Sequence, residues 1–167
     1  MRGLKIAAIV AFEKNRGIGL NNSIPWYMPE DLRHFKQLTS GSAVLMGRKT
    51  YDSLPEKFKP LPNRQNFVVS RTLKPGSLGD SVSIVSDPVD FIRMVKGGKQ
   101  SVLNNQLWIV GGQRIYEVTL GFIDEIYVTR INQSYQADAF FPDFEEGFRC
   151  LAIEEHDGYS FEHFGRK

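Results

Sequence analysis

The residue best placed to do chemistry is an aspartate within an amphipathic segment. Residues 29–39 begin with a proline and have helical periodicity. This spacing places Asp31 on the same stripe as Phe35 and Leu38. A carboxylate in a first turn gains about 0.3–1 kcal/mol from the helix dipole, but Glu30 serves that purpose from the exposed side. Burying an unpaired carboxylate costs far more, so Asp31 predicts a partner such as a cationic or multiply donating ligand.

Two junctions between a predicted strand and a predicted helix have the residues of a phosphate site. Gly47 follows the strand expected at 43–46 and leads into a helical segment that starts with Arg48, Lys49 and Thr50. Backbone N–H groups and a helix dipole at such a turn attract phosphate, and cations add charge-assisted contacts. The second junction is Val-Gly-Gly-Gln-Arg at 110–114, where glycines let a pyrophosphate approach the backbone. Either junction alone is more often an ordinary turn, but two in one chain favour a nucleotide ligand.

Further cations lie near the same predicted edge of the sheet. Ser70 and Arg71 end the strand expected at 66–70, where an arginine suits a nucleotide 2′-phosphate, although an ordinary exposed arginine explains it equally well. Arg64 lies just before this strand and is a candidate to pair with a carboxylate. The first 83 residues carry 13 Lys and Arg against 6 Asp and Glu, whereas the rest of the chain carries 8 against 13. Because several of these cations lie at the junctions, the asymmetry favours an anionic ligand.

Short apolar runs rich in β-branched residues alternate with helix-sized segments, which is the pattern of an α/β fold with a largely parallel sheet. We expect strands at 4–12, 43–46, 66–70, 82–85, 107–110 and 125–131, and helices at 29–39, 88–95 and 113–120. Two final runs, 148–155 and 159–164, flank Asp157 and Gly158, a pair that favours a hairpin turn. The expected architecture is a single α/β domain over 1–167, with a mostly parallel central sheet of about eight strands, an antiparallel C-terminal hairpin strand and about four flanking helices.

Composition limits the class of protein and its surroundings. The chain of 167 residues is 41% hydrophobic and 24% charged, and no apolar run reaches the roughly 18 residues of a membrane span, so we expect no membrane insertion. A net charge of +2 is too small to indicate nucleic acid. One cysteine excludes an internal disulfide framework, and three scattered histidines without cysteine partners lack metal-ligand spacing, so we expect no metal. These features fit a cytoplasmic protein.

Seven segments, in order along the chain, carry a more specific pattern: IAAIVA, GIGLNNSIPWYMPEDLRHFK, VLMGRKTYDSL, LPNRQNFVVSR, WIVGGQRIYE, IYVTRI and ADAFFPDF. Any one is a weak signal, but seven in register are specific. Over essentially its whole length the chain resembles dihydrofolate reductases of the bacterial kind. That resemblance implies an NADPH-dependent enzyme that reduces 7,8-dihydrofolate to tetrahydrofolate, by hydride transfer from nicotinamide C4 to pterin C6 with protonation at N5.

The resemblance implies a role for each matching position around the substrate. Asp31 would bond the exocyclic amine and adjacent ring nitrogen of the pterin and favour protonation of N5. Thr129 would be the hydroxyl partner of Asp31, and Trp26 would steady the loop that closes over the site. Arg64 would hold the α-carboxylate of the glutamate tail. The remaining implied contacts with dihydrofolate or antifolate inhibitors are Ile6, Ala7, Ile24, Leu32, Phe35, Leu54, Leu61, Val110 and Tyr116.

The same resemblance implies an extended NADPH site. The Gly- and Asn-rich loop at 13–28 has the length of a lid, and its implied nicotinamide-side contacts, with one from the first strand, are Ala8, Gly17, Ile18, Gly19, Leu20, Asn21, Asn22 and Ser23. The implied contacts of the pyrophosphate turn and its helix are Val110, Gly111, Gly112, Gln113, Arg114, Ile115 and Tyr116. The implied cluster at the 2′-phosphate is Gly47, Arg48, Lys49, Thr50, Ser70 and Arg71, which favours NADPH over NADH.

Two alternatives stay open at this point. A reductase of the same fold that acts on a ribosylamino-pyrimidine of riboflavin synthesis would share the NADPH features, but Asp31 on an apolar stripe together with Arg64 favours folate. A catalytically silent nucleotide-binding relative is the other, and the presence of Trp26 and Thr129 beside Asp31 argues against it. Gln113 departs from some family members, which have glycine there. We expect a monomer.

Overall fold

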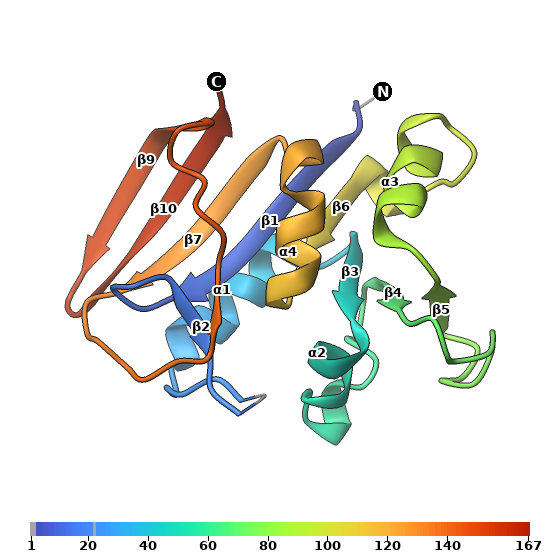
Figure 1. Cartoon of the computed structure of the whole chain (residues 1–167), viewed down its shortest axis with the longest axis horizontal. Coiled ribbons are helices and arrows are strands. Elements are labelled where there is room, and N and C mark those ends of the chain that lie inside the picture. Colours follow the sequence, from blue (N-terminus) through green and yellow to red (C-terminus); the bar gives the residue numbers. More distant parts are fainter. Residues whose placement is uncertain (1–2, 22) are drawn as a thin grey trace.

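A twisted eight-stranded sheet runs through the middle of the molecule (Figure 1). The computed structural model describes residues 3–21 and 23–167. The strand order is β5-β4-β3-β6-β1-β7-β10-β9. Neighbours from β5 to β7 are parallel, β10 is antiparallel to β7, and β9 is antiparallel to β10. The strands are β1 Lys5–Phe12, β3 Ala43–Gly47, β4 Gln65–Val69, β5 Val82–Val85, β6 Gln106–Ile109, β7 Glu125–Ile131, β9 Phe148–His156 and β10 Tyr159–Arg166.

Four α-helices lie in the described part of the chain: α1 Pro29–Thr39, α2 Arg48–Asp52, α3 Pro88–Lys96 and α4 Gln113–Thr119. Short 3₁₀ turns occur at η1 Glu56–Phe58, η2 Leu103–Asn105 and η3 Leu120–Phe122. Helix α3 begins as predicted, because the side chain of Asp87 accepts hydrogen bonds from the N–H groups of Val89 and Asp90, both at 2.9 Å. Helix α4 ends one residue before the predicted end, because Leu120 begins a 3₁₀ turn.

The predicted α/β architecture, with its mostly parallel sheet and C-terminal hairpin, is confirmed. A separate two-stranded sheet was not predicted: β2 Gly17–Gly19 pairs with β8 Ala139–Phe140. Strands of three and two residues are too short to show alternation in a sequence.

Each face of the sheet has its own apolar core. Helices α3 and α4 cover one face, where Ile92 and Tyr116 join a buried cluster with Ile6 of β1. Helices α1 and α2 cover the other face, whose cluster includes Tyr51 of α2 and Ala7 of β1. Alternate residues of β1 therefore enter opposite cores, as expected for a central strand covered on both faces. Figure 1 shows α4 in front of the sheet and α1 behind it.

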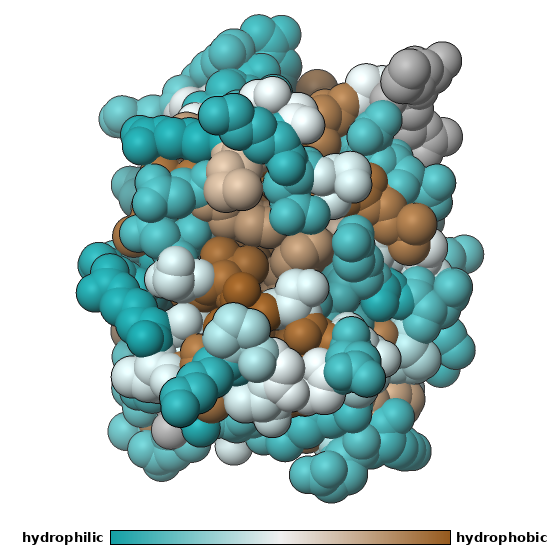
Figure 2. Space-filling view, turned by 90° about the vertical axis from the view of Figure 1, so that its right-hand side faces the viewer, coloured by the Kyte–Doolittle hydropathy of each residue, from teal (hydrophilic) through white to brown (hydrophobic). Residues whose placement is uncertain are grey.

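The sheet has two unequal edges. At one end, β5 is only four residues long, and a short edge strand limits pairing with other chains. Figure 2 shows the side of the molecule at this end, where apolar side chains gather near the centre and hydrophilic ones surround them. At the other end, the nine-residue strand β9 is exposed along most of its length.

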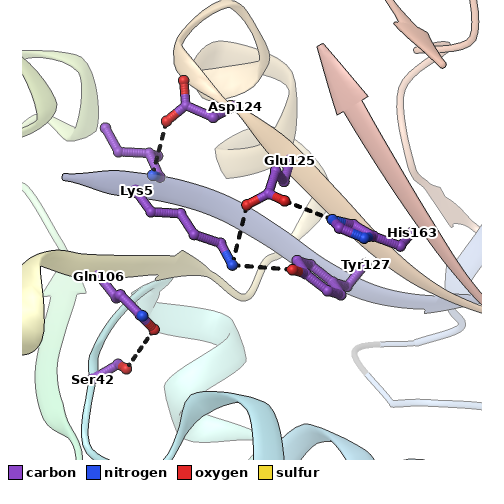
Figure 3. A network of polar contacts seen from close by, with 8 residues as sticks. Lys5, Ser42, Gln106, Asp124, Glu125, Tyr127 and His163 are labelled. Carbon is purple, nitrogen blue, oxygen red and sulfur yellow. Dashed lines mark hydrogen bonds and ion pairs between the residues drawn. The ribbon is translucent and has the colours of Figure 1, made fainter. Parts of the chain in front are cut away.

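A polar network links three neighbouring strands on the α1 side of the sheet (Figure 3). Lys5 of β1 donates to the hydroxyl of Tyr127 at 3.0 Å and forms an ion pair with Glu125 at 3.1 Å. His163 of β10 lies 2.6 Å from the other oxygen of Glu125 and stacks on Tyr127, with ring centroids 4.2 Å apart. Burial disfavours the charge of Glu125, but its bonds to Lys5 and His163 outweigh this and lower the pKa of the carboxyl.

We expect this network to make stability depend on pH. A carboxyl whose pKa is lowered on folding stabilises the protein above its ordinary pKa, and this contribution is lost as pH falls through the folded value. Glu125→Gln should therefore cost about 0.5–1 kcal/mol at neutral pH, since the side chain stays 25% exposed, and the cost should shrink in acid. Urea unfolding at several pH values measures this. The exposed Glu145→Gln is the control, and an equal cost at neutral and acid pH would contradict the assignment.

Candidate active site

The centre of the site is a contact between the first turn of α1 and the last part of β7. The hydroxyl of Thr129 donates to Oδ1 of Asp31 at 2.6 Å, across 98 positions of sequence. Pro29 starts the helix, and the N–H of Asp31 bonds the carbonyl of Met28 at 3.1 Å, which fixes the turn that carries the carboxylate. Asp31 is half-buried and Thr129 is buried. The structure thus brings together the two residues predicted to act as a pair.

The environment of Asp31 favours its protonated form. Burial raises the pKa of its carboxyl above the ordinary range, and the hydrogen bond from Thr129 and the charge of nearby His34 only partly offset this. A carboxyl with a raised pKa can carry a proton closer to neutral pH than an exposed aspartate does. The site therefore holds one group suited to acid catalysis.

Five of the predicted substrate contacts lie in one apolar cluster on the α1 side of the sheet. Ala7 and Leu61 are buried in it, and Phe35, Leu54 and Val110 pack against it. These residues come from β1, from α1, from the loops that follow α2 and η1, and from the end of β6. The cluster supplies a dry surface on the side of the sheet where Asp31 meets Thr129.

Four other predicted substrate contacts, Ile6, Ile24, Leu32 and Tyr116, lie outside this apolar cluster. The side chain of Ile6 is buried in the core beneath α3 and α4. Its backbone bonds Asp124 just before β7, whereas Ala11 is the β1 residue that pairs with Thr129, so the structure does not bring Ile6 next to Asp31. Ile24 and Leu32 are 59% and 54% exposed, as expected of residues at the rim of an open site. Tyr116 is buried with its hydroxyl donating to the carbonyl of Ile9 at 2.7 Å, and burial raises the pKa of that hydroxyl, so Tyr116 is a fixed neutral side chain.

Arg64 is held at the C-terminal end of α1. Its Nε donates to the carbonyl of Pro62 at 2.8 Å, its Nη1 donates to Thr39 at 3.0 Å, and its guanidinium lies 5.7 Å from the ring centroid of Phe35. Arg64 is thus placed near a predicted pocket-wall residue, with donors left over for an anion. An open hollow of about 690 Å³ lies beside it and extends over amide-rich residues to Asn104.

The two glycine junctions meet at the carboxyl edge of the sheet. The N–H of Gly47 bonds the carbonyl of Gly111 at 2.9 Å, so the ends of β3 and β6 are joined directly. Gly111 has φ +116°, a conformation available mainly to glycine, and a Cβ there would lie 3.3 Å from the ring of Tyr116. A Cβ on Gly112 would lie 3.4 Å from the hydroxyl oxygen of Thr50. Tyr116 and Thr50 therefore pack closely against the two glycines, and the turn has room for bare backbone, which a pyrophosphate can approach.

The predicted phosphate cations surround this edge. Arg48 and Lys49 are exposed at the start of α2, and Arg48 lies 3.5 Å from Asp52. Arg71 is exposed after β4. The hydroxyl of Ser70 is turned toward its own loop, where it accepts from the N–H of Leu73 at 3.1 Å. Because α2 has only five residues, its dipole is weak, so side chains and free N–H groups have to supply most of the attraction for phosphate.

The remaining predicted cofactor contacts lie on the α4 side of the sheet or in the loop after β1. Ala8 and Ile115 are buried in the core under α3 and α4, and Ile18 packs against that core. Arg114 is exposed on α4. Leu20 and Ser23 are joined by backbone bonds of 2.8 and 3.0 Å, while Asn22 lies outside the described residues.

The predicted lid is tied to the chain segment around β8. Beyond the pairing of β2 with β8, the side chain of Asp138 accepts from the N–H of Asn21 at 3.1 Å, and the N–H of Asp138 donates to the carbonyl of Gly19 at 2.9 Å. Trp26 packs against Tyr135 with ring centroids 5.5 Å apart. The loop is therefore braced from residues more than a hundred positions away.

Two contacts that anchor the lid, made by Glu13 and Gln113, were missed by sequence reasoning. Glu13 is fully buried, and its carboxylate accepts from the N–H groups of Asn15, Gly17 and Tyr135 at 2.7, 2.8 and 3.2 Å. Gln113, predicted as a contact of the pyrophosphate turn, accepts from the N–H of Phe140 at 2.7 Å and so connects the glycine turn to β8. A glutamate directly after an apolar strand was the one available signal, and it did not reveal which backbone groups it would bind.

These features define an α/β protein with one acid group beside an apolar surface and a sheet edge whose glycines and cations suit a phosphate. Comparison with known proteins agrees. The dihydrofolate reductase family model matches residues 5–164. The chain is 36% identical over 150 residues to the dihydrofolate reductase of Bacillus subtilis, which covers 90% of this chain and 83% of that protein. It is 33% identical over 177 residues to the Drosophila melanogaster dihydrofolate reductase, and this alignment covers 96% of each chain. It is 41% identical over 130 residues to the Escherichia coli type 9 dihydrofolate reductase, and this alignment covers 78% of this chain and 72% of that one.

The chain therefore belongs to the dihydrofolate reductase family, as its sequence resemblance indicates. Membership makes it an oxidoreductase of this type with a nicotinamide cofactor. No helix among the described residues is both long and apolar enough to cross a membrane.

Proposed function

We propose that this chain reduces 7,8-dihydrofolate to 5,6,7,8-tetrahydrofolate with NADPH. The cofactor supplies a hydride from nicotinamide C4 to pterin C6. The observation that carries the proposal is the hydrogen bond between Asp31 and Thr129 on the α1 side of the sheet. This bond presents a single acid group of raised pKa beside the apolar surface formed by Phe35 and Leu54. With no covalent intermediate, the work of the protein is to position two rings, exclude water and assist one protonation.

Each described element has a part in this proposal. Asp31 binds the amino group and ring nitrogen of the pterin and favours the proton at N5, while Thr129 fixes the orientation of the carboxylate. Phe35, Leu54 and Val110 exclude water, which strengthens the charged hydrogen bond. Antifolate inhibitors would compete for the same surface.

The NADPH contacts are proposed on the glycine edge. The backbone of the turn at Gly111 and Gly112, which carries no side chains, receives the pyrophosphate, and the exposed cations Arg48, Lys49 and Arg71 receive the 2′-phosphate. We also propose that the enzyme works as a monomer in the cytoplasm.

The direct test is oxidation of NADPH by purified protein in the presence of dihydrofolate, followed by absorbance. We expect a fall that requires both compounds and that antifolates abolish. Folded protein that binds NADPH without oxidising it would favour a silent binding relative. Activity on a ribosylamino-pyrimidine instead of dihydrofolate would move the substrate to riboflavin synthesis.

The 2′-phosphate assignment has its own prediction. Arg71→Ala should weaken NADPH about tenfold or more and leave NADH nearly unchanged, because only NADPH carries the phosphate that a charge-assisted bond would hold. Dissociation constants for both cofactors measure this. Arg149→Ala on the exposed strand β9 is a matched control for the loss of one charge. Equal weakening of NADPH and NADH would remove Arg71 from the 2′-phosphate site.

A further inference from the structure

One histidine lies next to the catalytic carboxylate without a place in the reaction described above. His34 is on α1, three positions after Asp31, and residues three apart lie on one side of a helix. Its half-buried ring stacks on Phe161 of β10, with ring centroids 3.8 Å apart and planes within 9°. This is a close and nearly parallel contact, so the ring has a defined position on the sheet.

The residue under His34 is the cross-strand neighbour of the residue that holds Asp31. Phe161 of β10 pairs directly with Thr129 of β7 in the antiparallel ladder. Side chains opposite each other in such a ladder point to the same face and lie about 4.5–5.5 Å apart at Cβ. Four residues are therefore linked in a closed circle of contacts. Thr129 hydrogen-bonds Asp31 and pairs with Phe161 across the strands, Phe161 stacks on His34, and His34 lies one helical turn from Asp31.

These contacts attach the first turns of α1 to the sheet at two adjacent points, Thr129 and Phe161. Phe35 and Leu38 also pack this helix against the sheet, but the stack of His34 on Phe161 is the contact beside the carboxylate itself. A small displacement of a group that assists a reaction can lower the rate considerably, so this contact matters for the position of Asp31.

The charges that face His34 come from two elements. On its own helix it faces Asp31, and from strand β9 it faces Glu154 and His156. His156 in turn bonds Glu154 at 2.8 Å and packs edge-on to Phe161 at 5.2 Å. Burial lowers the pKa of the His34 ring, and the negative charges of Asp31 and Glu154 oppose this. His34 is thus neutral at neutral pH and takes up a proton in acid, as Asp31 does.

We propose that His34 is a positioning residue for Asp31: its ring holds the carboxylate-bearing turn of α1 on the sheet, and its positive charge in acid opposes protonation of the carboxylate. The inference rests on the proposed function, in which Asp31 assists protonation of the substrate at N5. It adds a second titrating group that limits how far the reaction accelerates as pH falls.

Three substitutions separate the ring from the charge. His34→Phe keeps a ring on Phe161 without a charge. His34→Arg keeps a planar group that stacks on an aromatic face and carries a permanent charge. His34→Ala removes both. Two readouts are needed: the titration of the Asp31 carboxyl carbon by NMR in the ligand-free protein, identified by its absence in Asp31→Asn, and the pH profile of single-turnover NADPH oxidation.

The expected order follows from the sign of the charge. Asp31 should titrate at the lowest pH in His34→Arg, at the highest in His34→Phe, and between them in the unmodified protein. On the alkaline limb of the profile, where His34 is neutral, His34→Phe should react at the rate of the unmodified protein and His34→Arg about threefold slower. On the acid side, where His34 is charged, His34→Phe should react about threefold faster than the unmodified protein and His34→Arg at about the same rate as it. Threefold is the effect of a partly screened charge one turn away. His34→Ala should react about tenfold slower at every pH, and His34→Phe should restore this loss.

The outcomes are distinguishable from failure of the proposed function. His163→Phe is the control. Like His34, His163 stacks on an aromatic ring, but it lies on β10 and faces Glu125 and Tyr127. This variant should leave the titration of Asp31 unchanged. Identical titration of Asp31 in His34→Phe and His34→Arg would overturn the role of the charge, and an undiminished rate in folded His34→Ala would overturn the role of the ring. A pH profile that persists in Asp31→Asn would instead contradict the proposed function itself.

Discussion

Asp31→Asn is expected to remove most of the turnover near neutral pH, by about 10²–10⁴-fold, the usual contribution of a positioned acid or base. The amide has nearly the same shape and can still accept the hydrogen bond from Thr129, so the geometry of the site should survive. What is lost is the negative charge that favours the proton on the substrate. In acid, where solvent supplies that proton, the variant should recover part of its rate. Steady-state assays across the pH range, with NADPH binding measured separately, test this.

Asp31→Asn should lower turnover but raise the free energy of unfolding at neutral pH. Because burial raises the pKa of the Asp31 carboxyl in the folded state, the charged form costs stability at neutral pH, and this cost disappears as pH falls below the pKa of the unfolded chain. Asp31→Asn should therefore be more stable than the unmodified protein at neutral pH and nearly equal to it in acid. Asp80→Asn, at an exposed turn, is the control for stability.

The outcome that contradicts the catalytic role is a kinetic one. Near-normal turnover of Asp31→Asn at all pH values would remove Asp31 from the mechanism.

Gly111→Ala is expected to have the second largest effect. Any residue with a side chain is strained at φ +116°, and the new Cβ would lie 3.3 Å from Tyr116, whose hydroxyl is fixed on Ile9. The backbone must shift to relieve this, and the carbonyl of Gly111 is the group that bonds Gly47. We expect a loss of about 1–3 kcal/mol in stability and a loss of at least tenfold in NADPH affinity. Urea unfolding and a binding titration measure the two effects.

Gly79→Ala provides the matched control for backbone strain. Gly79 also has a left-handed conformation, with φ +95°, but a Cβ there would meet open space. This variant should lose stability without losing NADPH affinity. If Gly111→Ala weakens NADPH no more than Gly79→Ala does, the glycine turn is a structural feature and the cofactor lies elsewhere.

Much of the site is predictable because it follows from local patterns. Pro29 and the stripe of Asp31 and Phe35 predict a helix with an inward carboxylate, and α1 has the predicted bounds. The two glycine junctions follow strands that form within one residue of the predicted bounds, and the carboxyl ends of neighbouring parallel strands meet at one edge. Helical and strand periodicity depends on residues within a few positions of each other, which is the information a single sequence carries well.

Other features depend on contacts between distant segments. The sequence cannot tell which face of a strand buried on both sides points to the site, because both faces are apolar; hence Ile6 and Ala7 look alike, yet they enter opposite cores. The bonds of Glu13 to Tyr135 and of Gln113 to Phe140 join segments with no local relation. The same holds for the stack of His34 on Phe161.

Local patterns in the sequence were enough to predict the helices, most of the strands, the inward carboxylate and the glycine turns, and the family resemblance implied the pairing of Thr129 with Asp31. The contact between Gly47 and Gly111, and the distant residues that brace the loop after β1, became known only from the folded structure. The physical reason is that local backbone preferences and hydrophobic periodicity act over one or two turns, whereas hydrogen bonds and ring stacks are chosen by the packing of whole elements.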